Sequence, residues 1–205
     1  MKDLFILGLT GPSGAGKSEV ARVLAEKGFP LVDADALVRE VQQPGSPCLE
    51  ALAEAFSPAI LLPDGSLDRK KLAELAFISP ENTHTLNHIV HPAVMALSEE
   101  RFREAAQAGA RIAVLDAPLL FESGMDRICG RTVAVLAPPE ERLRRIRRRD
   151  GITEDQARIR MGAQPSDDYY TARASLVIRN DGGIARLRTA AEELAAKLER
   201  WRREG

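Results

Sequence analysis

Residues 11–18 read Gly11-Pro12-Ser13-Gly14-Ala15-Gly16-Lys17-Ser18 and complete the pattern G-x-x-x-x-G-K-[ST]. The apolar run Leu4–Leu9 precedes them, as expected of a strand that is buried on both faces of a parallel sheet. Apolar residues recur at helical spacing in Ser18–Lys27, and Gly28 stands where a helix C-terminus is expected. A strand, a glycine-rich loop and a helix in this order predict a phosphate-binding loop for a nucleoside triphosphate.

The residue types of this loop explain its predicted chemistry. Glycines allow consecutive backbone N–H groups to point at phosphate oxygens, and the following helix N-terminus adds partial positive charge. Lys17 is expected to reach the terminal phosphates, and the hydroxyl of Ser18 is expected to ligate Mg²⁺.

Composition narrows the class of protein. The 205 residues are 44% hydrophobic, which is enough for one α/β core with an additional lobe. With 29 basic and 30 acidic residues, the net charge of −1 gives no general attraction to nucleic acid or membranes. We see no secretory signal pattern and no apolar stretch near the ~20 residues that span a bilayer, so we expect a cytoplasmic protein. Two distant cysteines, Cys48 and Cys129, do not form a disulfide framework.

Four further apolar runs are expected to join the first strand in one sheet. Helical patterns separate them, which favours right-handed βαβ units and a parallel sheet. The predicted fold class is therefore α/β, a P-loop NTPase-type parallel sheet flanked by helices, with an inserted helical acceptor-binding lobe and a small helical lid. The four runs are Pro30–Asp33, Ile112–Asp116, Thr132–Ala137 and Leu176–Ile178.

We expect a single domain, residues 1–205, with three parts. The lid is predicted from a charged helix, a break at Asp150-Gly151 and a second helix that Thr153 opens. The parts are a core of residues 1–33, 111–144 and 165–205, an acceptor-binding lobe of residues 34–110, and a lid of residues 145–164.

Two aspartates end predicted strands at the sheet edge where ligands bind in such folds. Asp116 closes the run Ile112–Asp116, so it is either a carboxylate near Mg²⁺ or a cap for the next turn. Asp33 is the carboxylate best placed to accept a proton from a substrate hydroxyl. The alternative is a helix N-cap, which we expect to suit Asp35 better than Asp33.

The segment 142–149 contains six arginines in a nearly neutral chain. Arg145 and Arg149 are four residues apart, so they share a helix face and can meet a triphosphate together. A solvated helix face or an RNA-binding patch is the alternative, although the segment has no interleaved aromatic residues for base stacking.

All three histidines, His84, His88 and His91, lie at helical spacing after Glu81, which raises the question of a zinc site. Pro92 indicates that the helix ends or bends by His91. Hydrogen-bonding roles are therefore favoured over a metal site.

The chain resembles the dephospho-coenzyme A kinase family almost from end to end. The stretch Pro118-Leu119-Leu120-Phe121-Glu122, together with His91-Pro92, is similar to this family alone. The other matching stretches are Leu9-Thr10-Gly11, Gly14 to Ser18, Asp33-Ala34-Asp35, Pro44-Gly45, Asp64 to Arg69, Asp116, Arg145 to Gly151, Gln164 and Asn180-Asp181-Gly182.

The resemblance implies a kinase that transfers the γ-phosphoryl group of ATP to the ribose 3′-hydroxyl of dephospho-CoA, with Mg²⁺ as cofactor. It implies catalytic roles for Asp33, Lys17, Arg145 and Arg149. ATP would contact Gly11, Ser13, Gly14, Ala15, Gly16, Lys17, Ser18, Glu19, Asn180 and Gly182, with Ser18 also at the metal. The acceptor would contact Asp33, His91, Asp116 and Leu119. The expected protein is a monomer or weak oligomer without a nucleic-acid or membrane partner.

The chain departs from the family pattern at a few positions. Arg142 stands where relatives usually carry Gln, and Ser175 replaces an Asp. The loop has Pro12-Ser13 where relatives commonly have Gly-Ile, at variable positions of the motif. A P-loop kinase for another small acceptor and a nucleotide-dependent switch or ATPase are the alternatives. A guanine-type motif, which would favour the switch, is absent from the sequence.

Overall fold

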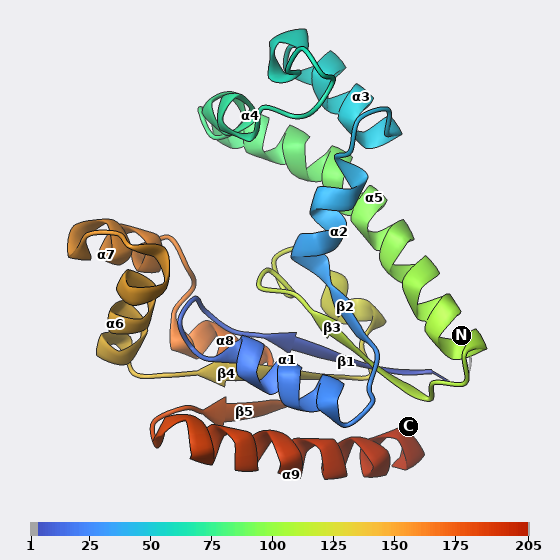
Figure 1. The fold of residues 1–205 in the computed structure, drawn as a ribbon, viewed down its shortest axis with the longest axis vertical. Helices are drawn as coiled ribbons and strands as arrows, with labels where there is room; N and C mark the ends of the chain where they lie inside the picture. The colour runs from blue at the N-terminus through green and yellow to red at the C-terminus, as the bar shows by residue number, and fades with distance from the viewer. Residues whose placement is uncertain (1–3, 205) are drawn as a thin grey trace. The chain divides into compact units, whose positions relative to one another are not determined.

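The apolar runs form a sheet of five strands in the computed structural model, which describes residues 4–204 (Figure 1). Across the sheet the order is β2-β3-β1-β4-β5, and β1 pairs in parallel with both β3 and β4. Each strand coincides with a predicted run to within a residue or two, so the predicted α/β class is confirmed. The strands are β1 Phe5–Thr10, β2 Leu31–Asp33, β3 Ile112–Asp116, β4 Arg131–Leu136 and β5 Leu176–Arg179.

The described chain divides into two compact units. The first contains the residues up to Val32 and those from Glu104 onward, and the second contains Asp33–Arg103. Within residues 4–204, no helix has the length and apolar character that crossing a membrane requires.

Helices cover both faces of the sheet in the first unit. α1 (Lys17–Glu26) and α9 (Gly183–Glu204) pack side by side on one face, and α8 (Asp167–Arg173) packs against β4 on the other (Figure 1). Val133 and Val135 of β4 belong to the core under α1 and α9. Ala134 and Leu136, which alternate with them, pack in a second cluster with Tyr170. A strand buried on both faces needs apolar residues at every position, which explains the continuous apolar runs in the sequence.

Two charged helices follow β4, α6 (Pro139–Asp150) and α7 (Glu154–Gly162). Gly151 is the C-cap of α6, and Thr153 caps α7 by accepting a hydrogen bond from the backbone N–H of Gln156 at 3.3 Å. The Gln156 side chain in turn accepts from the backbone N–H of Thr153 at 3.0 Å, which completes a capping box. The predicted helix, break and second helix are therefore present. A short 3-10 turn, η2, spans Met125–Ile128.

The second unit is helical, and its longest helix rules out one of the two alternatives predicted at Pro92, that the helix ends there. α5 continues through Pro92 and does not end at His91. Proline removes only one backbone hydrogen bond, and Val90 and Val94 keep one face of the helix buried on both sides of it. The elements of the second unit are α2 Ala34–Val41, α3 Pro47–Ala55, η1 Pro58–Ile60, α4 Arg69–Ala76 and α5 Pro80–Gln107. The last residues of α5 belong to the first unit.

Candidate active site

The glycine-rich loop lies between β1 and α1. Gly16 precedes α1 with φ +106°, and a Cβ atom there would lie 2.5 Å from Nδ2 of Asn180, so glycine is required on both counts. The buried Asn180 donates a hydrogen bond from Nδ2 to the carbonyl of Ala15 at 2.7 Å. Gly16, the N-cap of α1, makes no side-chain capping hydrogen bond, and an uncapped helix N-terminus favours the binding of an anion.

Lys17, the first residue of α1, forms an ion pair with Asp116. Asp116 ends β3 opposite Leu9 of β1, so parallel pairing brings its carboxylate beside the start of the loop. The two side chains are only 15% and 12% exposed. Ser18, the next residue, is exposed. The structure therefore brings together the predicted phosphate-binding lysine and the strand-end carboxylate.

Two predicted arginines reach the loop from α6. Arg145 donates from Nη1 to the carbonyls of Gly14 and Ala15, at 3.1 and 3.4 Å. Arg149 donates from Nη2 to Oγ of Ser13 at 3.2 Å. A hydrogen bond to Asp150 raises the pKa of Arg149 above its ordinary value. Part of the arginine run therefore contacts the phosphate loop, which argues against the alternative of a purely solvated helix face.

Sequence reasoning assigned no role to Arg142 or Gln164, yet both contact Ser13. Arg142 donates from Nε to the Ser13 carbonyl at 3.0 Å, and the Ser13 N–H donates to Oε1 of Gln164 at 3.1 Å. A signal was present in the sequence, because positions 142, 145 and 149 repeat at helical spacing along one face of α6.

Asp33 is the N-cap of α2. Its Oδ1 accepts hydrogen bonds from the backbone N–H groups of Asp35 and Ala36, at 2.9 and 3.2 Å. The expectation that Asp35 suits the cap better is wrong. An N-cap needs extended backbone, which the end of β2 gives to Asp33, whereas Asp35 already lies inside the helix. The Asp33 side chain is exposed, and its Oδ2 makes no hydrogen bond within the described part of the chain.

The other predicted ligand residues have varied surroundings. Glu19 forms ion pairs with Arg22 and Arg188, and the hydrogen bond from Arg22 lowers the pKa of Glu19. Leu119, in the turn after β3, is 58% exposed. Gly182 lies directly before α9.

The histidines of α5 show no metal-site geometry. The rings of His84 and His88 stack with their centroids 6.1 Å apart, and partial burial lowers the pKa of His91. Among residues 4–204, no three metal-ligating side chains are grouped to hold an ion.

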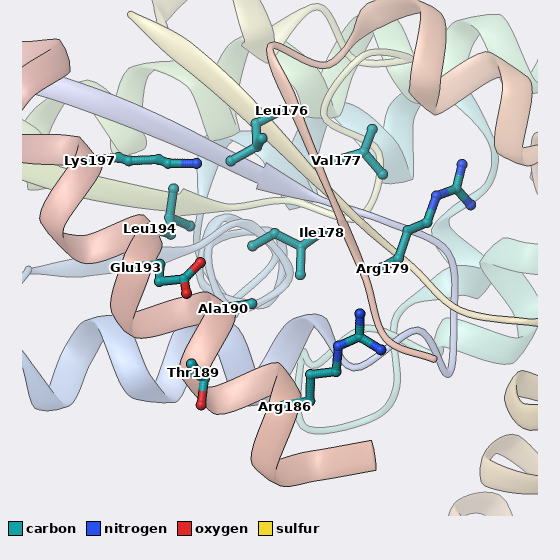
Figure 2. Close-up of a pocket in the computed structure, with 10 residues that line it drawn as sticks. All are labelled: Leu176, Val177, Ile178, Arg179, Arg186, Thr189, Ala190, Glu193, Leu194 and Lys197. Carbon is teal, nitrogen blue, oxygen red and sulfur yellow. The ribbon is translucent and has the colours of Figure 1, made fainter. Parts of the chain in front are cut away.

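A hollow of about 530 Å³ lies between β5 and α9. Figure 2 shows Arg179 and Arg186 at one end of it and Lys197 at the other. Its apolar floor includes Ile178 and Leu194. None of the residues predicted from the sequence to bind substrate or cofactor lines this hollow.

A parallel sheet with a complete phosphate loop, a lysine at the start of the following helix and arginines that reach the loop from a charged helix defines a P-loop phosphotransferase. Comparison with known proteins gives the family within that class. The family model described as dephospho-CoA kinase matches residues 5–186. The curated dephospho-CoA kinase of Corynebacterium glutamicum is 46% identical over 192 residues, which cover 94% of this chain and 96% of that protein.

The chain therefore belongs to the dephospho-CoA kinase family, and the sequence prediction of a kinase of coenzyme A biosynthesis is confirmed. Among solved structures, TT1252 from Thermus thermophilus is similar with a TM-score of 0.81 and 36% identity, covering 95% of this chain and 98% of that one. A shikimate kinase from Bacteroides thetaiotaomicron has a TM-score of 0.55 at 16% identity, with 95% and 98% coverage, a likeness in fold alone.

Proposed function

We propose that this chain transfers the γ-phosphoryl group of ATP to the ribose 3′-hydroxyl of dephospho-CoA, giving CoA and ADP. The observation that carries the proposal is the contact of Arg145 and Arg149 with the phosphate loop, in a member of this family. Lys17 of α1 and the two arginines of α6 can stabilise the transition state of phosphoryl transfer, because negative charge spreads over the oxygens of the transferring group.

In this proposal the triphosphate lies along the loop and the N-terminus of α1. Lys17 exchanges its contact with Asp116 for the terminal phosphates, and Arg145 and Arg149 add charge from α6. Oxygen ligands of the kind that Mg²⁺ prefers stand beside them, the exposed hydroxyl of Ser18 and the carboxylate of Asp116. When bound, Mg²⁺ neutralises phosphate charge.

We assign the base to Asp33. The capping hydrogen bonds hold Oδ1, which fixes the carboxylate and leaves Oδ2 to accept a proton. The 3′-hydroxyl gives its proton to Asp33 while its oxygen forms a bond to the γ-phosphorus. The bond between that phosphorus and the bridging oxygen breaks, and the electron pair leaves with ADP.

The remaining roles complete the proposal. The acceptor-binding lobe is residues 34–110, with His91 at the acceptor together with Asp116 and Leu119, and residues 145–164 are the lid over ATP. Asn180 and Gly182 lie by the adenine. In support, the buried Asn180 donates a hydrogen bond from Nδ2 to the carbonyl of Ala15 at 2.7 Å, which holds this segment against the phosphate loop. A cytoplasmic monomer or weak oligomer stays a prediction.

The test is an acceptor screen. ADP formation is measured with purified protein, ATP and Mg²⁺ against dephospho-CoA, nucleoside monophosphates and shikimate, each at several concentrations. We expect turnover with dephospho-CoA to exceed turnover with the others by at least ~10²-fold, because an acceptor site built for hydrogen bonds rejects compounds that leave them unmade. Comparable turnover with a nucleoside monophosphate or shikimate would favour the alternative of another P-loop kinase.

A further inference from the structure

All three polar groups of Ser13 form hydrogen bonds with one segment of the chain, which runs from α6 to Gln164, two residues after α7. Arg142 donates to its carbonyl at 3.0 Å, Gln164 accepts from its N–H at 3.1 Å, and Arg149 donates to its hydroxyl at 3.2 Å. We call Arg142, Gln164 and Ser13 the Ser13 clamp, because Arg142 also donates from Nη2 to Oε1 of Gln164 at 3.1 Å and closes the set.

Arg142 differs from the other arginines of its helix in burial. It is 5% exposed, whereas Arg149 is exposed. Burial lowers the pKa of Arg142, although an arginine stays protonated near neutral pH. Burying a guanidinium is costly unless its donors are paired. Its Nε and Nη2 are paired within the clamp, and Nη1 lies 3.7 Å from Oδ1 of Asp167. Because its donors face protein groups, Arg142 is not a phosphate ligand in this arrangement.

The backbone of α6 also touches the loop at this point. Gly14 has φ +79°, and a Cβ atom there would lie 2.8 Å from the carbonyl oxygen of Arg142. A side chain at position 14 would therefore push α6 away from the loop. The contact explains how a residue on α6 can fix the shape of the loop without touching a ligand.

We propose that Arg142 is a positioning residue that holds Ser13, through its carbonyl and through Gln164, so that the phosphate loop keeps one shape and α6 and α7 stay joined to it. Holding the loop in one conformation before ATP arrives removes an ordering cost from binding. The inference rests on the proposed binding of ATP at this loop and deepens it. Two departures from the family pattern, at positions 13 and 142, meet in this clamp.

The test measures ATP affinity in the absence of acceptor, by titration calorimetry with Mg²⁺, for Arg142→Met, Gln164→Met and the double variant. We expect each single variant to weaken ATP binding about tenfold, equivalent to about 1.4 kcal/mol. The ATP affinity of the double variant should be within about threefold of that of either single variant. The two losses do not multiply, since both substitutions act through Ser13. Arg148→Met is the matched control, because Arg148 is exposed on the same helix, and it should bind ATP like the wild type.

Conservative replacement separates positioning from general stability. Arg142→Gln keeps a donor for the Ser13 carbonyl and should bind ATP within about threefold of the wild type. The KM for dephospho-CoA should stay within about twofold in Arg142→Met, because the clamp includes none of the residues that we propose to bind the acceptor. If Arg142→Met does not fold, Gln164→Met carries the test, because it removes the acceptor of the Ser13 N–H and leaves the hydrogen bond from Arg142 to the Ser13 carbonyl in place.

The clamp is contradicted if Gln164→Met binds ATP as tightly as the wild type, if the losses of the two single variants multiply in the double variant, or if acceptor KM rises as much as ATP affinity falls. Failure of the proposed function looks different. A wild-type chain that binds ATP but does not phosphorylate dephospho-CoA removes the proposed reaction and leaves the clamp standing, while a wild-type chain that does not bind ATP overturns both.

Discussion

Replacing Lys17 by methionine tests the ion pair at the centre of the site. The substitution keeps the length of the side chain and removes its charge, which leaves the Asp116 carboxylate without its lysine. Both side chains are less than one-sixth exposed, so water replaces the lost contact poorly. A hydrogen bond to a charged group contributes about 1.5–3 kcal/mol, and we place this mostly buried pair at about 2 kcal/mol. For a chain of this size, that loss lowers Tm by about 4–8 °C.

The double variant Lys17→Met/Asp116→Asn should recover most of the lost stability, because it removes both charges together. Turnover should not recover, since the phosphates still lack the lysine; we expect a loss of at least ~10²-fold in both variants.

Differential scanning calorimetry and a coupled ADP assay give the two measurements. Lys27→Met is the matched control, because Lys27 is an exposed lysine just after the same helix. It should change neither the Tm nor the turnover. A Tm for Lys17→Met within 1 °C of the wild type, or a double variant no more stable than the single one, would refute the reasoning.

Asp33→Asn should lower kcat by ~10²-fold or more with both substrates still bound, because Asn caps α2 nearly as well but accepts no proton. Asp68→Asn, a second N-cap variant in the same unit, should leave kcat unchanged, and a rapid-quench step within a few-fold of wild type in Asp33→Asn would remove the base assignment. Arg149→Ala should slow the chemical step by ~10²-fold and affect acceptor KM little, with exposed Arg148→Ala as control; the opposite split would place Arg149 at the acceptor. Burial raises the pKa of Cys129 to about 12, so at pH 8 its thiol is protonated and should not react with a disulfide reagent until denaturant is added; rapid labelling of the folded protein would contradict this.

The strands and the loop were predictable because their signals are local. A parallel strand covered on both faces is apolar at every position, as in Ile112–Asp116, and no other constraint competes with that pattern. The loop motif carries its own requirement for glycine, which Gly16 meets with its positive φ and its close approach to Asn180.

Side-chain pairing was less predictable. The cap at Asp33 depends on where β2 stops, and a two-residue difference moves the role from Asp35 to Asp33. The passage of α5 through Pro92 depends on burial of one helix face, which the local preference of proline does not reveal. In the same way, Arg142 is more buried than the other arginines of its run because α6 packs on the loop, and the sequence does not distinguish it from them.

The central claim is that the phosphoryl group of ATP reaches the ribose 3′-hydroxyl of dephospho-CoA. The most direct measurement is ³¹P NMR of the product formed by the wild-type protein from ATP and dephospho-CoA, with authentic 3′-phosphorylated and 2′-phosphorylated isomers as references. The account predicts one new phosphomonoester resonance that coincides with the 3′ isomer and grows in step with ADP. A resonance at the 2′ position, or inorganic phosphate in place of a new ester, would contradict it.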